Sequence, residues 1–302
     1  MKDHRLNISE MRRLPLTGRC FLAGALLLVS VPLLADEPAT AAPPTKEQRA
    51  ALEAQNAPLV EQVESLDKQG KVKEAVAVAE KVLAAERKVL GNLDKEIANT
   101  LFFLAPRYER LEDFDSAKRA RADILTIYTH LYGKDHYWIT DCHSAIDYTV
   151  TLSQLTRAQR SQLERGHALL DQVVALEEQG KYSDALPLAE EAVNIRQGIL
   201  GKRHRDVASA IVWRGQLYRL LGKYPQAEAC FVQAIDIDRQ AIGEAHPIYA
   251  TELNHLAAIT ATRGNHKQAV PLYRRSLEIT KKVYGEAHAE YAFGLNNLAL
   301  CY

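Results

Sequence analysis

Residues 180–185 read Gly-Lys-Tyr-Ser-Asp-Ala, and similar stretches follow at 222–227 (Gly-Lys-Tyr-Pro-Gln-Ala) and 264–269 (Gly-Asn-His-Lys-Gln-Ala). The three copies are spaced by a constant 42-residue step. Self-similarity at a period of roughly 20 to 50 residues is typical of a solenoid, in which copies of one supersecondary unit stack on each other. The sequence therefore predicts a repeat protein.

A second turn pattern keeps the same step. Gly-x-x-His occurs at 201–204, 243–246 and 285–288, so each repeat has one turn before and one turn after a segment of helical length. In the copy that follows Gly222, apolar residues recur at the spacing of one helix face: Ala227, Cys230, Phe231, Ala234, Ile235 and Ile237. We expect two antiparallel helices per repeat and an all-α fold, because one hairpin alone cannot bury its apolar face.

The repeats resemble the tetratricopeptide repeat over residues 158–302. Small and aromatic residues stand at that family's signature positions: Gly215, Ala257, Ala185, Ala227 and Ala269 are the small ones, and Tyr218, Tyr302, Phe231 and Tyr273 the aromatic ones. The 42-residue step, with Gly-Glu-Ala-His-Pro at 243–247 and Leu-Asn-Asn-Leu-Ala at 295–299, is similar to the longer repeats of kinesin light chain and its bacterial relatives. The resemblance implies a right-handed superhelical α-solenoid of helix hairpins.

An earlier part of the chain repeats the same pattern less regularly. Gly70 begins a familiar turn, and one repeat later Glu112 stands where a glycine is expected. The spacing then breaks, since Gly133 and Gly201 are separated by more than one repeat and less than two. We predict that 137–153 is a first helix without its second helix, and that 158–179 begins a new block. The chain is thus divided into a degenerate block at 47–153 and a second block at 154–302, built on related units of about 110 residues.

The N-terminal residues are read as targeting and linker segments. Basic residues precede an apolar run at 21–34 that ends at Ala35, so residues 1–35 are predicted to be a signal peptide. Residues 36–46, rich in Pro and Ala, are predicted to be a disordered linker. We expect an exported protein, periplasmic or extracellular. The alternative is a protein anchored in the membrane by this N-terminal segment, although the run is shorter than the ~20 residues that a spanning helix needs.

Composition and motifs argue against several classes of function. Formal net charge is zero over 302 residues, and no basic stripe interleaved with aromatic residues suggests nucleic-acid binding. The sequence has no phosphate-binding glycine loop, no HExxH and no GxSxG. We therefore expect no enzymatic activity, no cofactor and no metal within these residues.

Histidines and cysteines are interpreted structurally. His136, His204, His246 and His288 occupy the same turn in successive repeats, where we expect each imidazole to cap a helix start. Equivalent positions in neighbouring repeats are too far apart to share a metal, because at least one packed helix separates them. Asp141-Cys142-His143 is the one local cluster of metal-capable or nucleophilic side chains, and a structural role is expected there too. Cys230 and Cys301 are predicted to be small apolar filler rather than disulfide partners.

The surface expected to bind a partner is the concave groove lined by the first helix of each repeat. The resemblance places seven polar or aromatic residues there: Trp213, Gln216, Arg219, Asn254, His255, Asn296 and Asn297. Such side chains can bond the backbone of an extended peptide or anchor it, and similar asparagines of kinesin light chain face cargo peptides. The alternative is that they are ordinary solvated helix residues. Leu170, Val174 and Trp213 stand where chaperone-binding repeats have Lys and Asn, so that subtype is not expected.

We expect a non-catalytic scaffold that binds a protein or peptide. Two alternatives stay open. The repeats could be the regulatory arm of a longer protein, because related bacterial repeats are often followed by a caspase-like CHAT protease domain. They could also form a self-assembling structural protein, since Tyr302 falls in the first helix of a further repeat and leaves that helix uncovered. For the same reason we expect the natural protein to continue beyond Tyr302.

Overall fold

The computed structural model describes residues 43–302 and places twelve α-helices there, with no strand among them. The predicted signal peptide and most of the predicted linker lie outside the described residues. The described chain forms two compact units, which divide between Gln154 and Leu155. We refer to residues 43–154 as the N-terminal block and to residues 155–302 as the C-terminal block.

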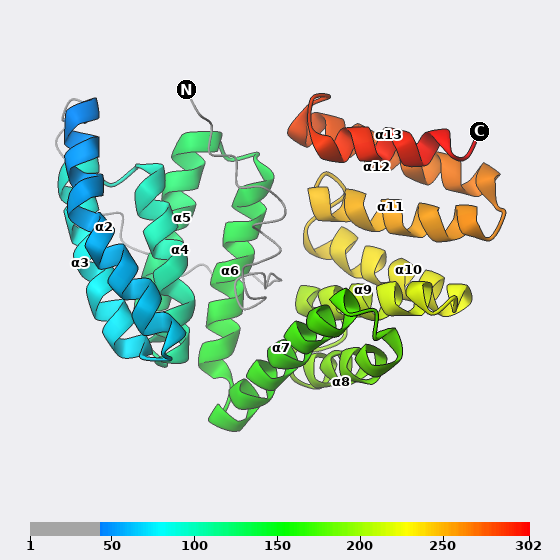
Figure 1. The fold of residues 1–302 in the computed structure, drawn as a ribbon, viewed down its shortest axis with the longest axis horizontal. Helices are drawn as coiled ribbons and strands as arrows, with labels where there is room; N and C mark the ends of the chain where they lie inside the picture. The colour runs from blue at the N-terminus through cyan, green and yellow to red at the C-terminus, as the bar shows by residue number, and fades with distance from the viewer. Residues whose placement is uncertain (1–42) are drawn as a thin grey trace. The chain divides into compact units, whose positions relative to one another are not determined.

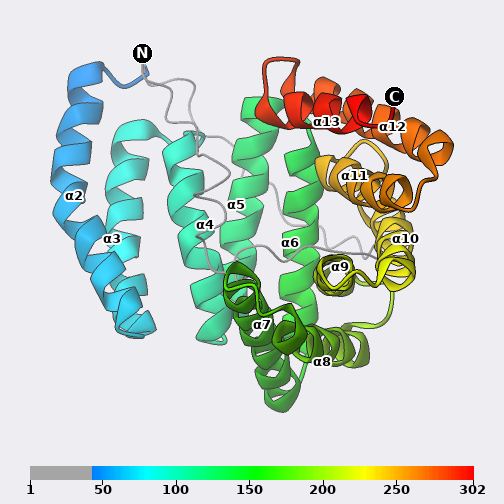
Figure 2. The same cartoon turned by 45° about the vertical axis from the view of Figure 1, so that its right-hand side comes forward.

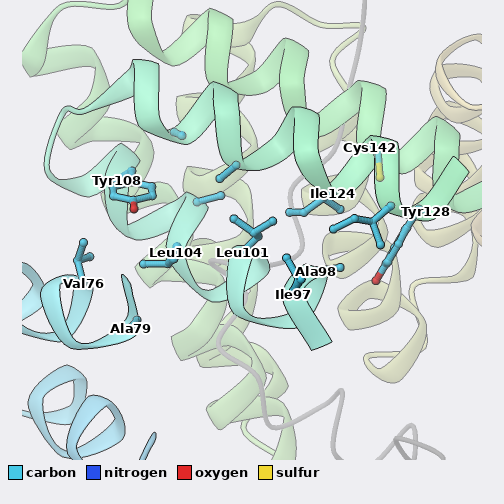
Figure 3. Packing of buried hydrophobic residues seen from close by; sticks show 14 of the residues in the cluster. Val76, Ala79, Ile97, Ala98, Leu101, Leu104, Tyr108, Ile124, Tyr128 and Cys142 are labelled. Atoms are coloured by element: carbon cyan, nitrogen blue, oxygen red, sulfur yellow. The ribbon is translucent and has the colours of Figure 1, made fainter. Parts of the chain in front are cut away.

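The N-terminal block contains five helices, each packed against the next along the chain (Figure 1). Their bounds are α2 (Lys46–Lys68), α3 (Val72–Leu90), α4 (Lys95–Arg110), α5 (Phe114–Tyr132) and α6 (Tyr137–Gln154). The centre of the block is an apolar layer to which α4 and α5 contribute most. Figure 3 shows Leu101, Leu104 and Ile124 pointing into this layer, and all three are at most 2% exposed.

The C-terminal block contains seven helices that stack in the same way (Figure 2). Their bounds are α7 (Arg157–Glu178), α8 (Tyr182–Leu200), α9 (Arg205–Leu220), α10 (Tyr224–Ala241), α11 (Pro247–Thr262), α12 (His266–Tyr284) and α13 (Ala289–Ala299). The first helices of the repeats are α7, α9, α11 and α13, and the second helices are α8, α10 and α12. The prediction of an all-α stack of helix hairpins is confirmed.

Glycine is needed at one turn and at one helix crossing, for two different physical reasons. At the turn between α9 and α10, Gly222 has a φ of 71°, in the left-handed region where only glycine avoids a steric penalty. At the crossing of the same two helices, a Cβ on Gly215 would lie 3.0 Å from Cys230 Cβ and 3.2 Å from the Phe231 ring. The absence of a side chain at Gly215 therefore permits the close crossing of α9 and α10.

The connection between α6 and α7 is short. Helix α6 ends at Gln154 and α7 begins at Arg157, so two residues connect them. Thr156 caps α7: its hydroxyl accepts the Gln159 N–H at 3.3 Å, and the Gln159 side chain accepts the Thr156 N–H at 2.9 Å. This reciprocal arrangement is a capping box. Thr45 and Gln48 form the same box at α2, which starts the N-terminal block.

The two capping boxes also correct the predicted helix starts. Helix α2 begins at Lys46 and α7 at Arg157, each one residue earlier than the sequence pattern indicated. A Thr three residues before a Gln was the available signal, and the sequence interpretation did not use it.

None of the described helices is both long and apolar enough to cross a lipid bilayer.

Candidate functional site

The seven residues predicted to line the groove lie on three successive first helices of the C-terminal block. Trp213, Gln216 and Arg219 are on α9, Asn254 and His255 on α11, and Asn296 and Asn297 on α13. Helical geometry places residues three or four apart on one face, so the α9 residues share a face. The structure shows which side chains meet and which are committed to packing.

The asparagines connect neighbouring repeats. Asn297 Nδ2 donates to Asn254 Oδ1 at 3.2 Å, which joins α13 to α11 across one repeat. Asn254 and Asn297 are half-buried, whereas Asn296 is exposed to solvent. An Asn side chain carries two N–H donors and an oxygen with two lone pairs, so this one bond leaves most of the hydrogen-bonding capacity of the pair unused. The pair can therefore present both donors and acceptors to a ligand.

The residues on α9 are more constrained. Arg219 Nε donates to Gln216 Oε1 at 2.9 Å, and both side chains are half-buried. Trp213 packs against the apolar core that α7 to α10 share. Its ring is thus part of the packing of this block as well as a candidate anchor for a ligand.

His255 has a structural role that its sequence position did not reveal. Its ring stacks on Phe231, with a centroid distance of 5.2 Å and an interplanar angle of 20°. Burial lowers the pKa of His255 to about 4, and the nearby Arg219 guanidinium acts in the same direction. The imidazole is therefore neutral near pH 7. It can offer a ligand a polar ring edge but no positive charge.

The turn histidines cap helices, as predicted. Nδ1 of His204, His246 and His288 accepts the N–H of the residue two positions later, at 3.1, 3.2 and 3.2 Å. His136 does the same at α6, at 3.3 Å. In the equivalent turn before α4, the carboxylate of Asp94 accepts the Glu96 N–H at 3.0 Å. The imidazoles thus satisfy orphan amide groups at the helix starts.

Cys142 and Cys230 do not have the exposure of a reactive thiol. Cys142 and Cys230 are buried, at 5% and 4% exposure. Burial raises the pKa of the Cys142 thiol to about 12, so the nucleophilic thiolate is not populated near neutral pH. Within residues 43–302, no group of three His, Cys, Asp or Glu side chains is arranged to hold a metal ion.

Two shallow hollows recur at equivalent positions of successive repeats. Five residues line the first, between α10 and α11, and their counterparts one repeat later line the second, between α12 and α13. The first is lined by Val232, Ile235, Asp236, Arg239 and Leu256, and the second includes Arg274, Leu277, Glu278, Lys281 and Leu298. Each has aliphatic side chains beside one acidic residue and at least one basic residue. The hollows are therefore a property of the repeat and give no indication of a specific ligand.

The sequence interpretation missed a set of buried charged residues in the C-terminal block. Arg205, Asp238 and Glu252 are 4%, 2% and 2% exposed. The available signal was a charged residue at a repeat position otherwise held by small residues: Ala210 and Gly294 stand one repeat before and one repeat after Glu252. These residues lie inside the stack and not on the candidate groove.

Comparison with protein families decides the family of this block. The sequence profile described as Tetratricopeptide repeat matches residues 164–240, 206–281 and 248–302. The starts of the three matches keep the step of the turns at Gly180, Gly222 and Gly264. Residues 164–302 are tetratricopeptide repeats. The C-terminal block is therefore a tetratricopeptide block, and no curated protein matches the sequence significantly.

Solved structures with a similar arrangement are distant in sequence. BtubC (BKLC) from P. vanneervenii is 17% identical, with 83% of each chain covered and a TM-score of 0.41. A putative kinesin light chain repeat protein from Podosopora anserina is 19% identical, with 76% of this chain and 97% of that chain covered and a TM-score of 0.35. Similarity at this level does not bear on function, and the family assignment rests on the repeat match.

Proposed function

We propose that this chain is a non-catalytic scaffold and that its tetratricopeptide block binds an extended peptide segment of another protein along α9, α11 and α13. The observation that carries the proposal is the pair Asn254 and Asn297, which lies across two repeats with an exposed Asn296 beside it. Amide side chains carry both donors and acceptors, as does the backbone of an extended peptide with its N–H and C=O groups. Tetratricopeptide repeats supply the fold in which such a row of first helices occurs.

The chemistry of the surface determines the kind of ligand that it suits. His255 is neutral, and Arg219, which donates to the neutral amide of Gln216, keeps its positive charge. Arg219 is therefore the single charged side chain among the seven candidate residues. Recognition would therefore depend on hydrogen bonds to the peptide backbone, with the partly buried Trp213 ring as the apolar contact. We propose a ligand segment that is neutral and extended rather than strongly acidic or basic.

The setting of this activity is also a proposal. The signal-like residues 1–35 favour an exported protein that meets its partner in the periplasm or outside the cell. The same binding surface would serve a regulatory arm of a longer protein equally well. In both cases the partner protein is recognised by the C-terminal block.

A peptide-array experiment with the chain of residues 36–302 tests the proposal. Immobilised peptides of varied sequence are probed with the wild-type chain, and the bound ones are titrated by calorimetry against Asn254→Ala and Asn296→Ala. One lost hydrogen bond is worth about 1 kcal/mol, so each substitution should weaken binding about fivefold. Gln233→Ala is the matched control, because Gln233 is an exposed amide on the second helix α10.

The outcomes separate the alternatives. Equal affinity of all three variants would show that the ligand does not use this surface. Light scattering of the same samples without peptide gives the molar mass. A mass that rises with protein concentration, with no peptide bound, would favour the self-assembling scaffold instead.

A further inference from the structure

Three charged side chains from three successive helices meet inside the tetratricopeptide block. Arg205 begins α9, Asp238 lies near the end of α10, and Glu252 lies in the second turn of α11. All are at most 4% exposed. Arg205 Nε lies 3.9 Å from Asp238 Oδ1. Glu252 interacts with both Asp238 and Arg205. The three residues therefore form a buried cluster at the junction between the repeat of α9 and α10 and the repeat of α11 and α12.

The surrounding elements add one more acid and one more base. Asp206 on α9 is 1% exposed, and Arg196 on α8 is 2% exposed. Arg196 Nη1 donates to the Asp206 carbonyl oxygen at 2.7 Å. His204 and His246 lie at the starts of α9 and α11, where their Nδ1 atoms accept backbone N–H groups. Tyr249 on α11 also interacts with Glu252, and burial raises the pKa of its phenol, which keeps it neutral near pH 7.

Helix α12, which packs on the other side of α11, contributes hydroxyl groups here. Ser276 Oγ donates to the Ala250 carbonyl at 2.7 Å, and Thr280 Oγ1 donates to the Ser276 carbonyl at 2.8 Å. Both hydroxyl groups are thus directed to backbone oxygens. Neither of these residues neutralises a carboxylate in the cluster.

Charge balance favours one shared proton on Asp238 and Glu252. Arg205 is the guanidinium that faces both carboxyl groups, so two ionised carboxylates would leave an unbalanced buried charge, which is costly. Glu252 is the group that fits this proton, because neither of its side-chain oxygens accepts a hydrogen bond within the described residues. Burial raises the pKa of Glu252 well above its ordinary value, and the neighbouring Asp238 raises it further.

The repeat fold does not require this cluster. The positions equivalent to Glu252 are Ala210 and Gly294, one repeat before and after. Thr280 stands at the position equivalent to Asp238, and Pro247 at the position equivalent to Arg205. Neighbouring repeats are thus built at these positions without the acidic pair. The acidic pair of Asp238 and Glu252 is costly to bury, and the fold does not need it. We therefore expect this pair to have a function beyond packing.

We propose that Asp238 and Glu252 share one proton, and that this proton holds α9, α10 and α11 together, so that the junction between the two repeats responds to pH. With the proton present, Glu252 donates to the Asp238 carboxylate, which also faces Arg205. When the proton leaves, two carboxylates share one guanidinium in a site without solvent. Their repulsion and their demand for water then favour separation of α11 from α10.

The sign of the pH effect follows from the raised pKa. Native Glu252 holds its proton more tightly than the unfolded chain does, so its contribution to stability is complete below about pH 4.5. That contribution declines as pH rises toward the pKa of the native group. Each pH unit within this window changes the opening equilibrium of the junction by up to about tenfold.

Hydrogen exchange of the full chain, measured from about pH 5 to pH 9 and expressed as protection factors, tests the proposal. In the wild type, protection of the α9, α10 and α11 amides should fall as pH rises. Glu252→Gln supplies a permanent donor to Asp238, so its protection should change little over the same range. Asp236→Asn is the matched control, because Asp236 is an exposed carboxylate on α10, and it should keep the wild-type slope.

A second variant guards against a simple folding defect. Asp238→Asn removes the other carboxylate and leaves Glu252 facing Arg205, so the pH at which protection falls should shift downward. Equal slopes for the wild type, Glu252→Gln and Asp238→Asn would overturn the proposal. A constant difference between Glu252→Gln and the wild type at every pH would also overturn it, because that result describes packing without a titrating proton.

Discussion

The two blocks have side chains of different polarity at three equivalent positions of the repeat. In the N-terminal block they are Glu109, Arg121 and Thr149. In the C-terminal block they are Arg219, Phe231 and Ile259. Each set comes from the corresponding three helices, α4, α5 and α6 in one block and α9, α10 and α11 in the other.

The N-terminal set is a buried polar network. Arg121 Nη2 donates to Glu109 Oε1 at 2.9 Å, and Arg121 Nε donates to the Thr149 hydroxyl at 2.7 Å. The side chains of Arg121 and Glu109 are 12% and 8% exposed, and Thr149 is fully buried. The network satisfies its members only while all three are present.

The C-terminal set is apolar at its centre. Phe231 and Ile259 are fully buried and pack together with Ala227. Arg219 donates to the Gln216 side chain instead of to an acid. The same helix crossing therefore accepts either a hydrogen-bonded ion pair or an aromatic and aliphatic pair, provided that each is complete.

Elsewhere the blocks agree closely. Tyr108 donates its hydroxyl to Glu80 at 2.7 Å, and Tyr218, its equivalent in the C-terminal block, donates to Glu190 at the same distance. The hydrogen bond between a tyrosine and a glutamate of neighbouring helices is thus present in both blocks. The side chains at the centre of the crossing, in contrast, are polar in one block and apolar in the other. The same arrangement of helices is therefore compatible with two different sets of side chains at these three positions.

The largest effect should come from breaking the polar network. Arg121→Met leaves Glu109 buried without its cation, and removal of one partner of a buried ion pair typically costs about 3–5 kcal/mol. Urea unfolding of the full chain, with hydrogen exchange to locate the loss in α4 to α6, measures this cost. Replacing the set by its C-terminal counterpart, Glu109→Arg with Arg121→Phe and Thr149→Ile, should restore most of it. A cost below about 1 kcal/mol for Arg121→Met would mean that the pair behaves as a surface ion pair.

A smaller effect on stability is expected from a change of pH, through a buried acid at another pair of equivalent positions. Glu86 on α3 corresponds to Arg196 on α8, and burial raises the pKa of Glu86 to about 7. The native chain therefore holds this proton more tightly than the unfolded chain. The stability of the N-terminal block should fall as pH rises from about 4.5 to about 7.

Glu86→Gln removes the titrating group and should flatten this part of the pH profile, measured by urea unfolding at a series of pH values. Glu80→Gln is a useful control, because Glu80 lies on the same helix and accepts the Tyr108 hydroxyl. An unchanged profile in Glu86→Gln would contradict the prediction.

The smallest effect concerns the turn before α5. Glu112 has a φ of 62°, whereas the equivalent residue Gly222 has a φ of 71°. A non-glycine residue in this region costs about 1–2 kcal/mol, and the greater freedom of glycine in the unfolded chain offsets part of the gain. Glu112→Gly should therefore stabilise the chain by roughly 0.5–1 kcal/mol, and Gly222→Glu should destabilise it. Melting temperatures of the two variants provide the measurement, and a destabilised Glu112→Gly would argue for a role of the Glu112 side chain.

The sequence by itself determined the elements and their order. The 42-residue step located the turns, and the spacing of apolar residues located the helices between them. The roles of His204, His246 and His288 as helix caps could also be predicted, because a cap involves residues only two positions apart. These features are local, so a one-dimensional pattern contains them.

Only the tertiary structure decided which side chains meet across helices. Arg205 and Asp238 lie on different helices and Glu252 follows on a third, yet the stack brings them into one buried cluster. The structure likewise commits His255 to a stack on Phe231, although the resemblance to tetratricopeptide repeats implied a place on the groove. Such contacts depend on how far one helix is rotated against the next, and hydrophobic periodicity defines the buried face of a helix without fixing the partner of each side chain.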